Sequence, residues 1–279
     1  MSSALRLLLD GPAHGAFNMG VDEALLASAA GGLATLRLYT WEGHWLSLGY
    51  GQPADPARSA ACRVAGVGLV RRATGGAAVL HGSDLTYALA APEDALPPGL
   101  AGVYGLVAEA LLEALAAVGV KAQRSPRGPG AGRGAPRAFD CFVAPAADEI
   151  CAGPGAGRKL VGSAQRRAGG GVLQHGSIRL APEPAAAARA AGLAPEYATS
   201  VSEDVGQAAF ERAGGSRALG EALAAALARR LGRVCAAGVL HPDEVERARA
   251  RVRSHARDPL AGPEPPGDPQ LSRGPKAGR

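Results

Sequence analysis

Cys141 and Lys159 are the two side chains in this sequence best suited to move an acyl group. Cys141 follows a loop rich in glycine and proline, which can leave a thiol accessible, and a thiolate is a strong nucleophile. Lys159 begins the run KLVGSAQ, whose small residues make room for a ligand. An ammonium group beside a carbonyl stabilises the oxyanion that forms on attack. These residue types could support nucleophilic chemistry at a carbonyl group, whereas a buried thiol and a solvated surface lysine are the alternatives for each residue alone.

Two further segments place glycines between apolar strands, RRATGGAAVLHG at residues 71–82 and GVLQHGSI at residues 171–178. Glycines there let the backbone approach a ligand closely and point its N–H groups toward it. A plain β-turn is the alternative for the first segment, and a structural histidine is the alternative for the second. Arginines before the first turn and His81 after it favour a binding site.

In chain order, these segments resemble the lipoate-attachment branch of the biotin/lipoate protein ligase superfamily. The Arg-Arg-x-Thr-Gly-Gly and QHGS segments carry the likeness to the superfamily, which extends over roughly residues 5–205. The short stretch Asp140-Cys141-Phe142 carries a likeness to one subgroup, the cysteine-dependent octanoyltransferases. The ATP-dependent lipoate ligases usually have an Asn-Asp pair in this region and need no cysteine, so Cys141 favours acyl transfer.

The resemblance implies a role for each site residue. Cys141 is implied as the nucleophile, and Lys159 as the cation near the acyl carbonyl. His175 is implied as a pocket or scaffold residue rather than a general base. The acyl tail would lie along Val79, Leu80 and Val161. The implied substrate-binding residues are Arg72, Thr74, Gly75, Gly76, Ala77, His81, Gly162, Ser163, Ala164, Gln165, His175 and Gly176.

The implied activity is transfer of an octanoyl group from octanoyl-acyl carrier protein to a lysine of a lipoyl-domain protein or the glycine-cleavage H protein. No cofactor is required, because one thioester replaces another. An ATP-dependent lipoate–protein ligase, which would use ATP and Mg, is the first alternative. A non-catalytic member that binds acyl or lipoyl groups is the second. Arginines at 124, 127, 133 and 137 and the net charge of +5 suit acidic protein partners.

Composition excludes several other classes of protein. The four cysteines form no CxxC pair and have no zinc spacing, so we expect no metal. No apolar run reaches the roughly 18–20 residues of a membrane span, and the first residues lack a secretory cleavage site. Aromatic residues make up only 4% of the chain, which argues against a nucleic-acid partner. We therefore expect a cytoplasmic protein with no membrane contact.

Strands and helices without strict β-α-β alternation predict an α+β fold. The resemblance implies a large mixed β-sheet flanked by helices, with further helices toward the C-terminus. We expect helices over residues 18–30, with an acidic first turn, and 57–65, 100–118, 183–191, 219–231 and 242–255. We expect strands over residues 5–9, 35–41, 45–49, 68–72, 77–80, 85–90, 139–143, 148–151, 159–164 and 171–180.

The chain divides into three regions by composition. Residues 1–205 would form the catalytic domain and residues 206–257 a C-terminal helical segment. Residues 258–279 contain too few apolar side chains to order themselves and would form a disordered tail. Residues 124–137 form a loop with no hydrophobic periodicity, directly before Cys141.

Overall fold

A computed structural model describes residues 4–125, 139–142, 149–153, 157–193 and 198–260. Within these residues, eight strands form a mixed sheet. They are β1 (Ala4–Ala13), β2 (Thr35–Trp41), β6 (Asp84–Pro92), β7 (Ala122–Arg124), β8 (Ile150–Ala152), β9 (Arg158–Ala168), β10 (Gly171–Arg179) and β11 (Val234–Ala237). Their order is β11-β1-β2-β6-β10-β9-β8-β7, and the central strands β2, β6, β10 and β9 pair antiparallel. The expected α+β fold with a large mixed sheet is confirmed.

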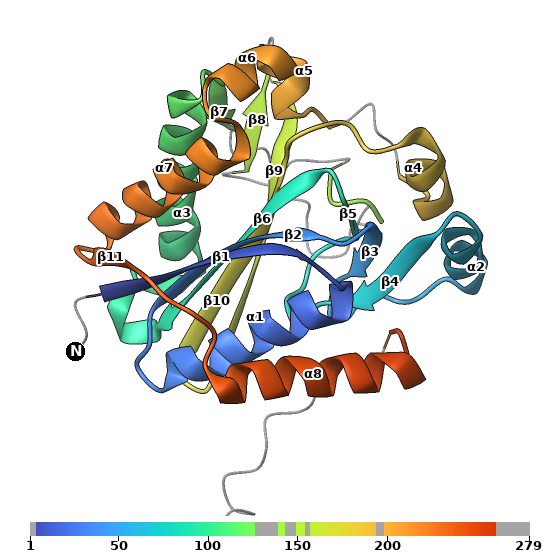
Figure 1. Cartoon of the computed structure of the whole chain (residues 1–279), viewed down its shortest axis with the longest axis horizontal. Coiled ribbons are helices and arrows are strands. Elements are labelled where there is room, and N and C mark those ends of the chain that lie inside the picture. Colours follow the sequence, from blue (N-terminus) through green and yellow to red (C-terminus); the bar gives the residue numbers. More distant parts are fainter. Residues whose placement is uncertain (1–3, 126–138, 143–148, 154–156, 194–197, 261–279) are drawn as a thin grey trace, which may run out of the picture.

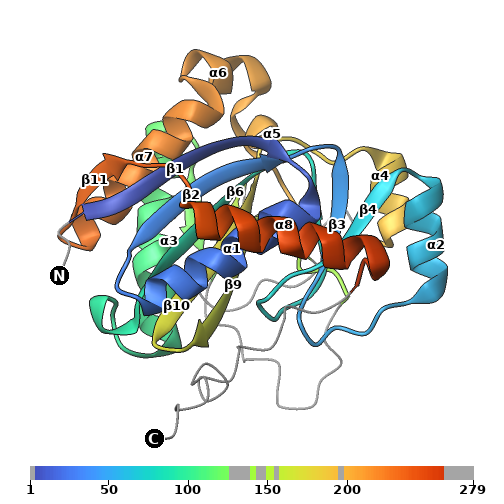
Figure 2. The same ribbon diagram turned by 60° about the horizontal axis from the view of Figure 1, so that its bottom comes forward.

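Helices cover both faces of this sheet (Figures 1 and 2). The helices are α1 (Gly15–Ala30), α2 (Pro56–Val64), α3 (Gly99–Ala117), α4 (Ala185–Ala191), α5 (Val201–Val205), α6 (Gln207–Arg212), α7 (Gly215–Arg230) and α8 (Pro242–Arg257), with a 3₁₀ turn at Glu93–Ala95. On β6, Leu85, Tyr87 and Leu89 face the core beneath α3 and α7, while Ala88 and Ala90 face α1. This alternation follows from the pleat of a strand.

A second, three-stranded sheet lies beside the large one (Figure 1). It consists of β3 (His44–Leu48), β4 (Val67–Arg71) and β5 (Val79–His81), in the order β4-β3-β5. The helices α2 and α4 pack against each other and share an apolar cluster with this sheet. Because β5 precedes β6 by only a short turn, the small sheet is held close to the α1 face of the large sheet.

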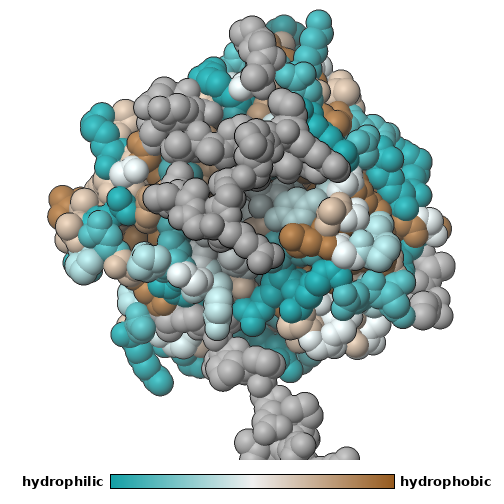
Figure 3. All heavy atoms as spheres, turned by 180° about the vertical axis from the view of Figure 1, so that it is seen from behind, coloured by the Kyte–Doolittle hydropathy of each residue, from teal (hydrophilic) through white to brown (hydrophobic). Residues whose placement is uncertain are grey.

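The helix α3 is long and apolar enough, by composition alone, to cross a membrane. Its residues Val107, Leu111 and Leu115 are buried in the core between the large sheet and α7, which accounts for that composition. Hydrophilic residues and small apolar patches alternate over the described part of the rear face (Figure 3).

Several predicted boundaries are wrong. The helix expected from residue 18 begins at Gly15, so Asp22 and Glu23 lie in its middle rather than in its first turn. Residues 139–142 form a turn with one parallel bridge, Ala78 to Asp140, instead of a strand, while Val143 lies outside the described residues. Four short elements were not predicted: β7, α5, α6 and β11.

The segment 206–257 is not helical throughout. Its strand β11 pairs parallel with β1, α7 packs on α3, and α8 packs on α1. The boundary between residues 205 and 206 stays a prediction. The expected tail is described only to residue 260, where the carbonyl of Leu260 accepts a 2.9 Å hydrogen bond from Arg71 Nε. Residues 261–279, and residues 126–137 of the loop before Cys141, lie outside the described residues.

Candidate active site

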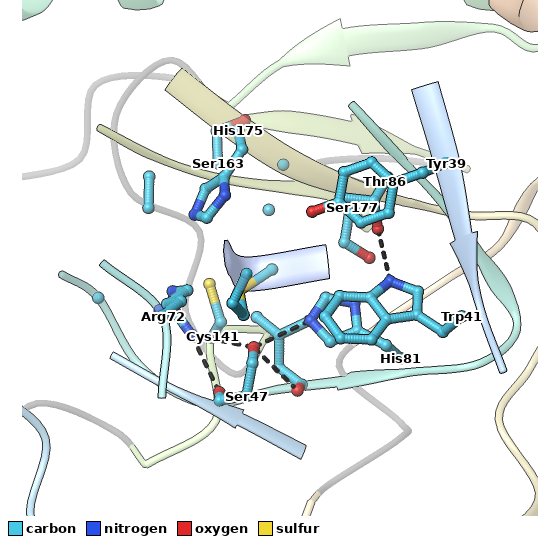
Figure 4. Close-up of a pocket in the computed structure, with 16 residues that line it drawn as sticks. Tyr39, Trp41, Ser47, Arg72, His81, Thr86, Cys141, Ser163, His175 and Ser177 are labelled. Carbon is cyan, nitrogen blue, oxygen red and sulfur yellow. Dashed lines mark hydrogen bonds between the residues drawn. The ribbon is translucent and has the colours of Figure 1, made fainter. Parts of the chain in front are cut away.

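A small cavity, with mostly non-polar walls, lies between the two sheets (Figure 4). The predicted residues that line it are Arg72, Gly76, Val79, His81, Cys141, Gly162, Ser163, Ala164, His175 and Gly176. The lining residues that were not predicted are Met19, Tyr39, Trp41, Ser47, Thr86 and Ser177. The fold thus brings together segments that are about a hundred residues apart in the sequence.

Lys159 lies buried beside Cys141. Its Nζ is 3.3 Å from Cys141 Sγ, 2.6 Å from the Cys141 carbonyl oxygen and 2.6 Å from Glu149 Oε1. The lysine side chain is 1% exposed, and the thiol residue is half-buried at the cavity wall. The interpretation of Lys159 as a solvated surface charge is therefore wrong. Glu149 was not predicted, although a buried lysine requires a nearby carboxylate.

The charges around Lys159 keep it protonated. Burial alone would lower the pKa of this lysine, but Cys141 and Glu149, by charge and by hydrogen bonds, raise it above its ordinary value. The side chain is therefore an ammonium group at neutral pH. It can donate to sulfur or to an oxyanion, and it is unsuited to remove a proton.

Glycines form the cavity wall next to Cys141. A Cβ at Gly162 would lie 3.3 Å from Cys141 Sγ. A Cβ at Gly176 would lie 2.6 Å from the Gly162 carbonyl oxygen and 2.6 Å from the Tyr87 ring. Larger residues at either position would push into the thiol or the neighbouring strand. The close approach at Gly176 leaves no room for a side chain, whereas a Cβ at Gly162 would require the thiol to shift by a few tenths of an ångström.

Arg72 organises the glycine turn. Its Nη2 donates to the carbonyl oxygens of Gly75 and Ala77, both at 2.7 Å, and its Nη1 donates to the Ser47 carbonyl oxygen at 3.0 Å. Gly76 has φ of +93°, which favours glycine, and it reaches the cavity. Gly75 and Ala77 do not line the cavity. Their carbonyl oxygens accept hydrogen bonds from Arg72 instead.

Two cavity histidines are each held at both ring nitrogens. His175 contacts Asp22 at 2.8 Å and Thr74 at 2.6 Å, and His81 contacts Asp84 at 2.8 Å. Each carboxylate accepts from Nδ1–H, which leaves Nε2 to accept from a hydroxyl. This arrangement is that of a scaffold, as expected for His175. Neither aspartate was predicted as a site residue. For Asp22, the available signal was a carboxylate within an apolar stretch of α1, which indicates a buried partner.

Other expectations about the pocket need correction. Leu80 and Val161 do not line it, because their side chains pack in the cores of the small and large sheets respectively. Thr74 is fully buried behind His175, and Gln165 bonds Gln174 at 2.9 Å outside the cavity lining.

The arginine cluster before Cys141 is described at one position only. Arg124 pairs with Glu109 of α3 at 2.9 Å, and the other three arginines lie outside the described residues. The described part of the chain contains no group of three side chains suited to hold a metal ion.

The comparisons of this chain with known proteins agree on one family. The family described as "Lipoyl protein ligase A/B catalytic domain" matches residues 14–208. Octanoyltransferase LipM of Kyrpidia tusciae is 40% identical over 188 residues, which cover 65% of this chain and 68% of that protein. Octanoyltransferase LipM of Moorella thermoacetica is 43% identical over 180 residues, which cover 63% and 64%. The match thus spans about two thirds of the length of these curated relatives.

Solved structures share the fold. The crystal structure of lipoate-protein ligase A bound with ATP superposes with a TM-score of 0.70 at 21% identity, covering 90% of this chain and 94% of that one. A bi-partite lipoate protein ligase from Thermoplasma acidophilum gives a TM-score of 0.63 at 20% identity, covering 90% and 92%.

Proposed function

Because the chain belongs to the lipoyl protein ligase A/B catalytic domain family, we propose that it is an octanoyltransferase of that family. The octanoyl group would come from octanoyl-acyl carrier protein and would go to a lysine of a lipoyl-domain protein or glycine-cleavage H protein. It would pass through a thioester on Cys141. Such an enzyme works in the cytoplasm, where acyl carrier protein is found.

One observation carries the proposal: a buried ammonium group touches a thiol at the wall of a cavity. Lys159 Nζ lies 3.3 Å from Cys141 Sγ, and Glu149 holds the lysine in place. Arg72 also carries a positive charge near this thiol. Burial lowers the pKa of Arg72, and the interaction with Cys141 acts in the opposite direction. Two cations therefore lie near the sulfur that would attack the thioester.

In the first step, Cys141 Sγ gives up its proton and attacks the carbonyl carbon of the carrier-bound thioester. The new carbon–sulfur bond forms, the carbon–sulfur bond to the carrier breaks, and the carrier leaves as a thiol that takes up the proton. The backbone N–H groups of Cys141 and Phe142 already donate to the Ala78 carbonyl and to Asp140, at 3.0 and 2.8 Å. These two N–H groups are therefore not free to donate to the oxyanion. Lys159 Nζ donates to sulfur in the free enzyme, and this N–H is released to the oxyanion once sulfur binds carbon.

In the second step, the acceptor lysine attacks the octanoyl thioester. A carbon–nitrogen bond forms, the carbon–sulfur bond breaks, and the proton lost by the amine goes to the leaving sulfur, so Cys141 is restored as a thiol beside Lys159. Exchange of one thioester for another is nearly neutral in free energy, and amide formation makes the sequence favourable. The reaction in this form needs no ATP and no metal.

The test is transfer in the absence of ATP. Purified protein is incubated with octanoyl-acyl carrier protein and an unmodified lipoyl domain, and the mass of the lipoyl domain is followed. We expect octanoylation by the wild type and by Cys235→Ala, which removes a half-buried cysteine of β11, but not by Cys141→Ala. Modification only with free octanoate and ATP would make the protein a ligase, and no modification under either condition would indicate a binding protein.

A further inference from the structure

Cys141 lies in a turn rather than in a helix or a strand, and the turn is formed by residues 139–142. The turn pairs with the residue before β5 through one parallel bridge, Ala78 to Asp140. In this bridge the Cys141 N–H donates to the Ala78 carbonyl oxygen at 3.0 Å, and the Ala78 N–H donates to the Phe139 carbonyl oxygen at 2.8 Å. A single bridge fixes a turn less firmly than a strand ladder does, so side chains that bind its backbone matter for the position of the thiol.

Two side chains donate to the two ends of this turn. Lys159 Nζ, from β9, donates to the Cys141 carbonyl oxygen at 2.6 Å. Gln52 Nε2 donates to the Phe139 carbonyl oxygen at 3.1 Å. The Phe139 ring is held as well, because the Arg58 guanidinium carbon lies 3.4 Å from its centre. The turn is therefore bound to the large sheet at its thiol residue and to the segment after β3 at its first residue.

Gln52 is itself firmly anchored. Its Oε1 accepts from the Gly49 N–H at 3.2 Å, and its own N–H donates to the Gly49 carbonyl oxygen at 3.0 Å. Arg71 Nη1, at the end of β4, donates to the carbonyl oxygens of Gly49 and Gln52 at 2.8 and 2.7 Å. Gln52 does not line the cavity. Its amide group therefore links the rigid end of the small sheet to the turn, without contact with the acyl site.

We propose that Gln52 is a positioning residue for Cys141, which holds the turn so that Sγ stays beside Lys159 and in reach of the thioester carbonyl. The inference rests on the proposed acyl transfer and adds to it a residue that acts through the nucleophile. Attack requires the reacting atoms to lie about 3–3.5 Å apart, and a misplacement of about 1 Å can lower the rate by about 10²-fold. Loss of the Gln52 donor frees the first residue of the turn, so Sγ spends less time in the productive position.

The experiment measures single-turnover acylation of Cys141 over a range of octanoyl-acyl carrier protein concentrations. Gln52→Met keeps the length of the side chain but removes its donor and its acceptor. The maximal rate should fall about 10- to 100-fold. The carrier concentration that gives half of that rate should not change, because substrate binding is not altered. A small octanoyl thioester without the carrier should show the same loss, since it reacts with the same Sγ.

A second variant separates the two hydrogen bonds of the amide group. Gln52→Glu can still accept from the Gly49 N–H, but its carboxylate cannot donate to the Phe139 carbonyl oxygen. It should retain the turn after β3 and lose the same factor in maximal rate, even if Gln52→Met folds poorly. The melting temperature should fall by about 2–4 °C, as expected for the loss of one hydrogen bond in a protein of this size.

Gln207 provides the matched control. Its Nε2 donates to Glu211 Oε1 at 2.8 Å on the exposed surface of α6, so Gln207→Met should acylate at the wild-type rate. Wild-type maximal rates in Gln52→Met and Gln52→Glu would overturn the inference. A loss seen only with the carrier-bound substrate would also overturn it, because Gln52 would then be a docking residue. Failure of the wild type to acylate Cys141 would instead overturn the proposed function.

Discussion

The buried ion pair between Lys159 and Glu149 can be removed in two ways with opposite consequences for stability. Both side chains are almost fully buried, and their N–O distance is 2.6 Å. Lys159→Met leaves the Glu149 carboxylate buried without its cation, and breaking such a pair costs about 3–5 kcal/mol. For a protein of this size, each kcal/mol lowers the melting temperature by about 2–4 °C. The expected loss is therefore about 6–20 °C.

The double variant Lys159→Met, Glu149→Leu should recover most of that loss. It replaces the pair with apolar side chains, and such replacements of buried ion pairs are often neutral or stabilising. Acylation should stay defective, because no ammonium group remains beside Cys141 Sγ. Loss of one donor to an oxyanion lowers the rate by about 10²–10³. Stability and activity would thus separate in one pair of proteins.

Two measurements decide the outcome. Thermal unfolding followed by circular dichroism gives the melting temperatures of the single and double variants. Single-turnover acylation followed by intact mass gives the rate with octanoyl-acyl carrier protein. An unchanged melting temperature for Lys159→Met would refute the buried ion pair. A double variant that acylates near the wild-type rate would refute the role of Lys159 in catalysis.

Three further changes have defined outcomes. Arg72→Lys replaces the two nitrogens of a planar fork, which donate to carbonyl oxygens on two sides, with a single point of donation. The glycine turn should therefore shift, and acylation should fall about 10²-fold in stopped assays with octanoyl thioester. Gly162→Ala places a Cβ 3.3 Å from Cys141 Sγ; acylation should fall roughly tenfold with little change in melting temperature, and an unaffected rate would show that the thiol has room to move. Burial and the charge of Asp84 raise the pKa of Glu183 from 4.5 to about 7, so the stability linked to its protonated form is present below pH 4.5 and lost as pH rises through 7. Glu183→Gln removes this pH dependence. The free energy of unfolding of the variant, relative to that of the wild type, should therefore be about 3 kcal/mol more favourable at pH 8 than at pH 5, as measured by urea unfolding at the two pH values.

Elements with strong periodicity or composition were predictable from sequence. The strand β2 has the predicted bounds, and α3 was predicted within one residue at each end. The short elements β7, α5, α6 and β11 were not, because three to six residues carry too little of a period. The strand β11 exists through its pairing with β1, more than two hundred residues away, and that contact leaves no local signal. Residues 139–142 were predicted as a strand because the segment is largely apolar. In the structure they form a turn, in which Phe142 and Cys141 pack with Val79, and Phe139 packs with the small-sheet cluster.

The site was predictable where residue types are unusual and not where partners come from distant elements. Cys141, Arg72 and the glycines of β9 and β10 were predicted because they stand in the motifs that carry the family resemblance. Glu149 could not be singled out, because its role depends on the burial of Lys159. Leu80 was misplaced because neighbouring residues of a strand point to opposite faces, so only Val79 of that pair reaches the cavity.

The central claim, that Cys141 carries the acyl group, can be tested directly by the mass of the trapped intermediate. The protein is mixed with octanoyl-acyl carrier protein without ATP and without an acceptor, and then analysed intact and after proteolysis. We predict an added mass of one octanoyl group on the peptide containing Cys141, removed by hydroxylamine and absent in Cys141→Ala. An adduct on Cys62, Cys151 or Cys235 that persists in Cys141→Ala, or no adduct in a protein that still octanoylates a lipoyl domain, would contradict the claim.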